Sequence, residues 1–264
     1  MAILMAKKSD IQKNKKPSFF WFATEVGRAV AELGISIPYR KLFHNNYKGD
    51  GHPVLVLPGF MASDISTNPL RKFIKKLGYA AYGWDLGRNY GKLHSLELLV
   101  EKVEDIYAEH HQKVTIIGWS LGGVFARQIA KERPNMVRQV ITLGSPFQDI
   151  EKPNNASWLY NLISEGKRVV DLDPLLLEDL PKPAPVPTTA IYTKEDGVVP
   201  WSMCMEKEED ATHQNIQVRG SHLGLGVNPS VFDIIADRLL YDEENWEHFD
   251  PKSAIKDLLF YPSL

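Results

Sequence analysis

Ser120 lies in the stretch with the clearest chemical signal of the chain, Gly118-Trp119-Ser120-Leu121-Gly122. Four β-prone residues, 114–117, come before it and a helical pattern follows, so we expect a sharp strand-to-helix turn at the serine. Such a turn strains the backbone and exposes the hydroxyl, while glycines on both sides avoid a collision between a Cβ atom and the neighbouring strand or helix. The pattern predicts a nucleophilic serine.

A base and an acid that could serve this serine follow later in the chain. His222 lies in a glycine-flanked loop after the predicted strand 215–219, where a general base can move. Asp196 follows the predicted strand 188–193 and is our choice for the acid, because Asp-Gly fits a tight turn; Glu195 is the alternative. The order serine, aspartate, histidine differs from both familiar serine protease orders. Together the residues predict a catalytic triad for acyl transfer.

Backbone N–H groups near the serine could bind the oxyanion of a tetrahedral intermediate. One belongs to Leu121, directly after the serine. The other belongs to the loop after the predicted strand 54–57, where we choose Phe60, with Met61 as the less favoured alternative. Pro58 in this loop has no N–H to donate.

Four motifs together resemble the α/β-hydrolase superfamily, specifically its bacterial lipase and carboxylesterase branch: G-W-S-L-G-G, L-P-G-F, E-D-G-V-V-P and G-S-H-L-G-L. The stretches 62–70 and 83–89 are similar to companion motifs in a group of bacterial members. The resemblance covers about residues 50–241 and implies the α/β-hydrolase fold and ester hydrolysis through an acyl-enzyme, but not the substrate. The apolar residues of the expected cap and Trp119 favour hydrophobic esters, and we expect no cofactor and no metal. Many lipases have histidine where this chain has Pro58, a change that keeps the backbone donor.

Three alternatives to an esterase stay open. A thioesterase or an acyltransferase would use the same triad, and access of water to the acyl-enzyme decides between hydrolysis and transfer. A noncatalytic, membrane-associated module with a hydrolase-like fold would have no activated serine.

Strands and helices alternate along most of the chain. We expect strands at 54–57, 79–83, 114–118, 138–143, 188–193 and 215–219, and helices at about 69–77, 95–109, 121–132 and 229–241. This order predicts a mostly parallel sheet with helices on both faces and the catalytic loops on one rim.

The alternation breaks between about residues 147 and 187, where we expect a short helical cap insertion with a helix at 158–169. The cap could be a movable lid or a static helix packed on the sheet. We expect six side chains to contact the substrate: Met61, Trp119, Trp158, Leu159, Val198 and Leu223.

The N-terminal segment 1–34 is expected to be a basic arm followed by an amphipathic helix, and 35–264 to be the hydrolase domain. Five lysines lie within residues 7–16, and Ser18 can cap a helix that ends at Gly34. Its apolar stripe contains Phe19, Phe22, Val26, Ala29, Val30 and Leu33. We favour packing of this stripe on the hydrolase body; the alternative is weak contact with an anionic membrane.

Composition narrows the function classes further. For a chain of 264 residues, a formal net charge of −2 argues against a general nucleic-acid-binding protein, whose affinity needs a concentrated basic surface. No apolar run approaches the 18 residues of a membrane span. The N-terminus does not resemble a secretory signal, so we expect a cytoplasmic protein. The single cysteine, Cys204, is expected to be a buried small side chain.

Other polar groups are given structural roles. We expect His110 and His111 to end a solvated helix, because metal-ligand spacing is missing. His213 lies in a polar segment before a predicted strand and competes poorly with His222. We expect the segment 85–89 to form a turn or an internal salt bridge, and the acidic residues of 206–210 to be solvated.

Overall fold

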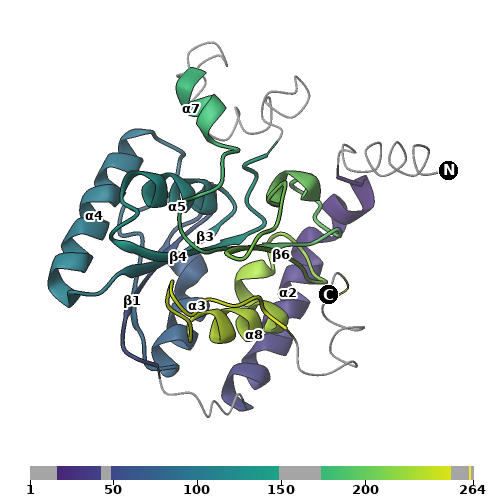
Figure 1. Cartoon of the computed structure of the whole chain (residues 1–264). Coiled ribbons are helices and arrows are strands. Elements are labelled where there is room, and N and C mark those ends of the chain that lie inside the picture. The colour runs from purple at the N-terminus through teal and green to yellow at the C-terminus, as the bar shows by residue number, and fades with distance from the viewer. Residues whose placement is uncertain (1–16, 43–48, 149–173, 251–261, 263–264) are drawn as a thin grey trace.

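The computed structural model describes residues 17–42, 49–148, 174–250 and 262 (Figure 1). Its centre is a six-stranded, fully parallel sheet in the order β2-β1-β3-β4-β5-β6. The strands are β1 (Pro53–Leu57), β2 (Ala80–Tyr82), β3 (Val114–Trp119), β4 (Val137–Leu143), β5 (Thr188–Tyr192) and β6 (His213–Gln217). The predicted parallel α/β sheet is confirmed. β6 begins two residues earlier than predicted, so His213 belongs to the sheet and not to a loop before it.

Helices cover both faces of the sheet (Figure 1). They are α2 (Phe19–Leu42), α3 (Asp64–Lys76), α4 (His94–His110), α5 (Leu121–Glu132), α7 (Pro174–Asp179) and α8 (Pro229–Arg238), with short 3-10 helices η2 (Trp201–Cys204) and η3 (Leu225–Val227). Side chains alternate between two cores. In β1, Val54 and Val56 pack with α3 and α8, whereas Leu55 and Leu57 pack with α4 and α5.

α3 begins at Asp64, five residues before the predicted start at Pro69. The Asp64 carboxylate lies in the first turn and accepts the backbone N–H groups of Trp84 and Asp85, each at 2.8 Å. A negative charge at this end is stabilised by the helix dipole, and it ties the start of α3 to the loop after β2. Pro69 therefore lies inside the helix, where it has no N–H to donate to the preceding turn.

α2 is longer than predicted and continues through Gly34 and Pro38 to Leu42. Ser18 caps its start by accepting the N–H of Phe20 at 3.3 Å. Beyond Gly34 the helix is anchored by Tyr39, whose hydroxyl donates to Asp233 on α8. These tertiary contacts hold the last turns together, so the predicted domain boundary at residue 34 falls in the middle of a helix.

The favoured packing of the α2 stripe on the hydrolase body is wrong. The stripe faces outward: Phe19 is 82%, Phe22 60%, Val26 67% and Val30 64% exposed. The opposite face is polar and buried, and Glu25 on it is only 2% exposed. Hydrogen bonds to neighbouring loops, and not hydrophobicity, determine which face of α2 packs inward. Within the described residues, no helix is both long and apolar enough to cross a membrane.

The described part of the predicted cap contains α7. Lys131 of α5 donates to the Asp179 carboxylate at 2.9 Å, which joins α7 to the hydrolase body. The predicted helix 158–169, with Trp158 and Leu159, lies outside the described residues. The choice between a lid and a static helix stays a prediction.

Glu206 corrects the prediction of a solvated acidic run. Its side chain is buried and forms an ion pair with Arg127 of α5, which is itself buried. Arg127 also donates to the Lys182 carbonyl at 2.8 Å and lies over the Phe147 ring. A buried guanidinium requires a paired carboxylate, and Glu206 supplies it. Residues 207–210 are exposed, as predicted.

Candidate active site

Ser120 occupies the turn between β3 and α5. Its backbone has φ 52° and ψ −121°, a strained conformation for a residue with a side chain. Its N–H donates to the Leu143 carbonyl at 2.8 Å. A Cβ atom at Gly118 would collide with the α5 backbone, and one at Gly122 would collide with the end of β1. The structure thus has the strand, turn and helix that the sequence predicts here.

His222 and Asp196 meet in the buried space beside this turn. His222 Nδ1 lies 2.6 Å from Asp196 Oδ2, and both side chains are almost fully buried. The other carboxylate oxygen, Oδ1, accepts the N–H groups of Val198 at 2.8 Å and Val199 at 2.6 Å. The tight turn therefore holds the carboxylate, and the carboxylate holds the ring.

Glu195, the alternative acid, has different partners. Its carboxylate accepts the N–H of Gly220 at 3.2 Å and lies 3.7 Å from the Arg219 guanidinium. The structure therefore brings Asp196, and not Glu195, to the imidazole.

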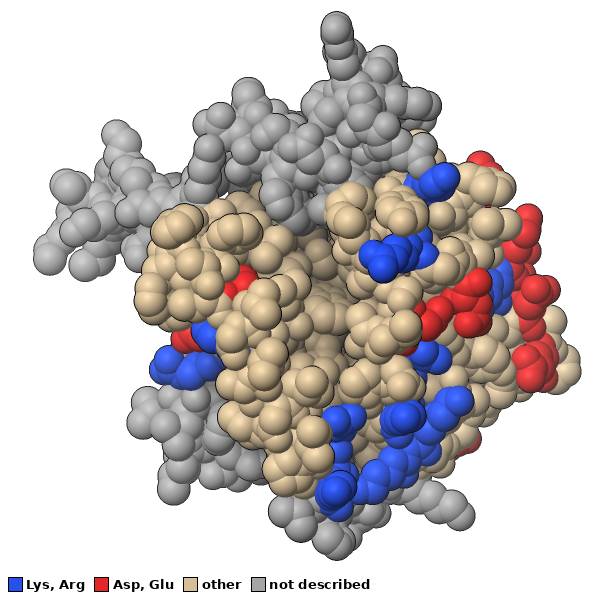
Figure 2. All heavy atoms as spheres, turned by 180° about the vertical axis from the view of Figure 1, so that it is seen from behind, with Lys and Arg blue, Asp and Glu red and all other residues tan. Residues whose placement is uncertain are grey.

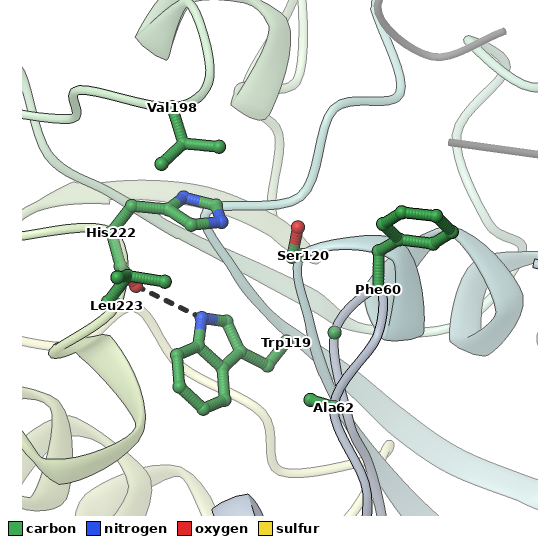
Figure 3. Close-up of a pocket in the computed structure, with 8 residues that line it drawn as sticks. Phe60, Ala62, Trp119, Ser120, Val198, His222 and Leu223 are labelled. Atoms are coloured by element: carbon green, nitrogen blue, oxygen red, sulfur yellow. Dashed lines mark hydrogen bonds between the residues drawn. The ribbon is translucent and has the colours of Figure 1, made fainter. Parts of the chain in front are cut away.

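A cavity of about 160 Å³ separates the imidazole from the loop after β1. Figure 3 shows the His222 ring beside the Ser120 hydroxyl, with Phe60 across from it. The cavity is lined by Gly59, Phe60, Ala62, Trp119, Ser120, Val198, His222 and Leu223. The three proposed catalytic side chains thus come from the ends of β3, β5 and β6 and gather at one rim of the sheet.

The charge environment of His222 suits a base. Burial of the ring acts to lower its pKa, but the adjacent Asp196 carboxylate and the charge of Glu25 outweigh burial, so the pKa of His222 lies above its ordinary value. The imidazolium that forms when the ring takes a proton is therefore stabilised where it is needed.

The loop after β1 presents a backbone donor next to the serine. Within the described part of the chain, the N–H groups of Phe60 and Leu121 have no acceptor. The N–H of Met61 is already used, because it donates to the Asn89 carbonyl at 2.7 Å. The N–H of Met61 is therefore occupied, while those of Phe60 and Leu121 are available to a ligand.

Asn89 shapes this loop and was not predicted to do so. Its buried side-chain amide donates to the Pro58 carbonyl at 2.8 Å, and its backbone N–H donates to the Ala62 carbonyl at 2.9 Å. Together with the bond from Met61, these contacts hold the loop at three points. The sequence predicted a turn or a salt bridge at residues 85–89. The salt bridge is present, since Asp85 pairs with Lys102, and residues 86–88 form a bend.

Three of the six predicted substrate contacts line the cavity: Trp119, Val198 and Leu223. Met61 does not line it and is 54% exposed. Trp158 and Leu159 lie outside the described residues. Trp119 also donates its indole N–H to the His222 carbonyl at 3.1 Å, which links the strand of the serine to the loop of the histidine (Figure 3).

The rival groups form no second centre. His110 hydrogen bonds with the Tyr82 hydroxyl, and His213 with Asp210 and the Ala184 carbonyl. Cys204 is buried, and burial raises the pKa of its thiol well above the ordinary value. No cluster of three or more potential metal ligands occurs among the residues that the structure covers.

Comparison with known proteins agrees with this geometry. The family model of palmitoyl protein thioesterase matches residues 53–180, somewhat less than half of the chain. This segment contains Phe60 and Ser120 and ends before Asp196 and His222. No curated protein matches the chain.

Solved structures with similar folds include lipases and a thioesterase. Aspergillus fumigatus lipase B is 17% identical with a TM-score of 0.56; the match covers 75% of this chain and only 56% of the lipase. The Paleococcus ferrophilus monoacylglycerol lipase is 14% identical with a TM-score of 0.53, over 74% of this chain and 96% of that one. The thioesterase domain from the curacin biosynthetic pathway is 14% identical with a TM-score of 0.50, over 74% and 93%. The parallel sheet and the serine turn at its rim, with these likenesses, show that the chain has the α/β-hydrolase fold.

Proposed function

We propose that the protein hydrolyses carboxylic esters through a covalent acyl-enzyme on Ser120. The observation that carries this proposal is the hydrogen bond between His222 and Asp196, on a ring that lies beside the Ser120 hydroxyl in an apolar cavity (Figure 3). A serine hydroxyl is a weak nucleophile at neutral pH and needs an oriented base nearby.

The reaction would begin when Ser120 Oγ attacks the ester carbonyl carbon. His222 accepts the hydroxyl proton as the new C–O bond forms, and Asp196 holds the ring and stabilises its charge. The tetrahedral intermediate collapses as His222 returns the proton to the leaving alcohol. Water then attacks the acyl-enzyme by the same route and releases the acid.

The oxyanion would be bound by the N–H groups of Phe60 and Leu121, which have no acceptor in the described part of the chain. One comes from the loop after β1 and the other from the first residue of α5. An oxyanion donor of this kind contributes about 10²–10³ in kcat.

The raised pKa of His222 sets the expected pH dependence. The ring must be neutral to accept the serine proton, so the rate should rise with pH through the pKa of His222. The midpoint of this rise should lie above the pKa of an ordinary histidine.

The lining of the cavity supports a hydrophobic acyl group. Phe60, Trp119, Val198 and Leu223 supply apolar surface beside the serine. Two of the similar structures are named as a lipase and a monoacylglycerol lipase, and these names describe enzymes that act on esters.

Thioesters are a second candidate class of substrate, favoured by the match to the palmitoyl protein thioesterase family over residues 53–180. The same residues would act on a thioester. A thiolate is a better leaving group than an alkoxide, so its departure needs less protonation by His222. Esters and thioesters of identical acyl chains, compared by kcat/KM, distinguish the two.

The test is Ser120→Ala, assayed with p-nitrophenyl esters and acyl thioesters of increasing chain length. We expect the turnover to fall by about 10⁴-fold or more with unchanged circular dichroism, because the nucleophile is lost. A fluorophosphonate probe should label the wild type and the control Ser95→Ala, which changes a serine of α4, but not Ser120→Ala. Turnover close to wild type in Ser120→Ala would refute the proposal.

A further inference from the structure

The carboxylate of Glu25 binds two loops of the site at once. It accepts the backbone N–H groups of Gly197 at 2.8 Å, His222 at 3.2 Å and Leu223 at 3.0 Å. Gly197 belongs to the acid loop, residues 194–200, and the other two to the histidine loop, residues 219–224. A buried carboxylate that accepts three N–H groups from two segments fixes the distance between them.

The contact between α2 and the acid loop depends on Gly197. A Cβ atom there would collide with the backbone of Trp21 and Phe22. Arg28, one turn after Glu25, pairs with its carboxylate at 2.9 Å and donates to the carbonyls of Gly220 at 3.1 Å and Glu195 at 3.0 Å. α2 therefore binds both loops through donors and acceptors, which explains why its polar face is the buried one.

We propose that Glu25 is a positioning residue that fixes the acid loop and the histidine loop relative to each other and so holds Asp196 against His222. The proposal rests on the proposed function, since it assigns a task within the same site. Glu25 contacts His222 through the backbone N–H and not through the ring, and it does not reach the reacting atoms.

The charge of Glu25 gives this role a signature that a structural contact would lack. It acts with Asp196 to raise the pKa of His222 against the effect of burial. Among the described residues, the other charged groups on or facing the two loops are Arg28 and Glu32 of α2, the pair of Glu195 and Arg219, and the exposed Lys194. Replacing Glu25 with glutamine removes this charge and weakens the contacts to both loops, so it should lower the pKa of His222.

Glu32 offers a matched control on the same helix. Its carboxylate accepts the N–H of Ser221 at 2.8 Å and the Asn228 amide at 3.2 Å, so it also holds the histidine loop. It does not contact the acid loop in the described residues, and its charge does not contribute to the pKa shift of His222. Glu32→Gln should leave that pKa unchanged.

The experiment measures the pKa of the His222 ring by NMR, assigned with His222→Gln, and kcat and KM on the best ester. We expect Glu25→Gln to lower the pKa and to reduce kcat by about ten- to hundredfold with little change in KM, because misplacement of catalytic groups slows the chemical step. Glu25→Asp should keep the pKa near wild type but still lose kcat, because the shorter side chain cannot reach both loops.

An unchanged pKa and kcat in Glu25→Gln would overturn the proposal, and so would an equal pKa shift in Glu32→Gln. Should Glu25→Gln fail to fold, Glu25→Asp decides through its kcat, and wild-type kcat in it would also overturn the proposal. The NMR pKa needs no substrate. A lowered pKa with no hydrolysis by the wild type would thus reject the proposed function and keep the effect of Glu25 on His222.

A second inference comes from the opposite face of α2. Its outer face consists of side chains spaced by three or four residues: Phe19, Phe22, Val26, Val30, Leu33 and Ile37, all exposed. The ends of α2 and α3 lie together, since Lys76 donates to the Arg40 carbonyl at 2.7 Å. Lys41, Lys72 and Lys75 are exposed there, and Figure 2 shows basic side chains gathered beside an uncharged area on one face.

We propose that the outer face of α2 docks on an anionic lipid surface. An apolar helix face bordered by cationic side chains has the chemistry of an interfacial helix. Five lysines at residues 7–16 precede the helix and add charge of the same sign. A partner without negative charge would not attract these lysines.

Flotation with vesicles of phosphatidylcholine, with and without 30 mol% phosphatidylserine, tests the docking. The wild type should float with the anionic vesicles and less so at high salt. Phe22→Ser/Val26→Ser should bind at least about tenfold more weakly, because two exposed apolar side chains are lost. The control Ile65→Ser/Leu93→Ser removes two other exposed apolar side chains and should bind like the wild type.

Equal flotation of Phe22→Ser/Val26→Ser and the wild type would overturn this proposal. So would a wild type that stays unbound. A wild-type dimer that Phe22→Ser/Val26→Ser dissociates would assign the outer face to a second copy of the chain instead.

Discussion

Asp196 is held by more than its contact with the imidazole. Its Oδ1 accepts two N–H groups of the turn that follows, while Oδ2 is left for His222 Nδ1 at 2.6 Å. One side chain therefore organises its own loop and orients the His222 ring. Glu195 is one methylene longer and points to Gly220 instead.

The two neighbouring carboxylates should respond differently to neutral substitution. We expect Asp196→Asn to lower kcat by about 10⁴-fold, because the amide stabilises the wrong tautomer of His222 and cannot balance its charge. Glu195→Gln should lower kcat less than about tenfold, because among the described residues its carboxylate contacts only the backbone N–H of Gly220 and the exposed Arg219. Steady-state kinetics on one ester, with circular dichroism as the check of folding, measures both. A larger loss in Glu195→Gln than in Asp196→Asn would reverse the assignment.

Sequence reasoning points to residues whose chemistry has a local signature, and the structure brings them together at one rim of the sheet. Ser120 is marked by flanking glycines, Asp196 by the Asp-Gly turn, and His222 by its place after a strand. Glu25 and Asn89 carry no such signature, because their partners are backbone groups of loops distant in the chain. From the sequence alone, such a carboxylate or amide looks like any other on a surface helix or loop. Only the fold shows which distant loops it contacts.

At the scale of elements, the ends of a helix match the prediction where its apolar face packs on the sheet. α5 begins and ends where predicted, and α4 differs by one residue at each end, because their apolar faces pack on the sheet. α3 begins earlier than its proline suggests, since Asp64 binds the N–H groups after β2. A capping contact made by tertiary structure is invisible in the local pattern.

α2 shows the limit of the amphipathic pattern most clearly. Periodicity says which face of a helix is apolar, but not which face docks. The polar face lies inward here because the acid loop and the histidine loop offer N–H groups that burial would otherwise leave unpaired, at a cost of about 1–3 kcal/mol each. The sequence predicts the helix and misses its orientation, and the orientation carries both further inferences.

At the scale of the whole molecule, a buried polar cluster joins three neighbouring strands of the sheet, β1, β3 and β4. His52, just before β1, is fully buried, and its Nε2 lies 2.9 Å from the Thr115 hydroxyl of β3. Its Nδ1 lies 2.6 Å from Asp50, which also binds Arg138 of β4 at 3.0 Å. Three strands of the parallel sheet are thus joined around a histidine that must stay neutral.

This histidine makes the stability of the fold depend on pH. Burial and the nearby Arg138 charge lower the pKa of His52 to about 4, against about 6.5 in the unfolded chain. Between these values the unfolded state binds more protons, so the free energy of unfolding falls as the pH drops from about 6.5 to about 4. The contribution of His52 should reach about 3 kcal/mol, which urea unfolding at a series of pH values measures.

His52→Gln should flatten this dependence, because glutamine cannot take up a proton in the unfolded chain. It also lowers stability at pH 7, where the ring contacts are lost, so the slope between pH 6.5 and 4 is the quantity to compare. The control His94→Gln changes a histidine whose side chain is 71% exposed and should keep the wild-type slope. Equal slopes for wild type and His52→Gln would show that His52 is protonated as readily in the folded protein as in the unfolded chain, contrary to its burial between β1 and β3.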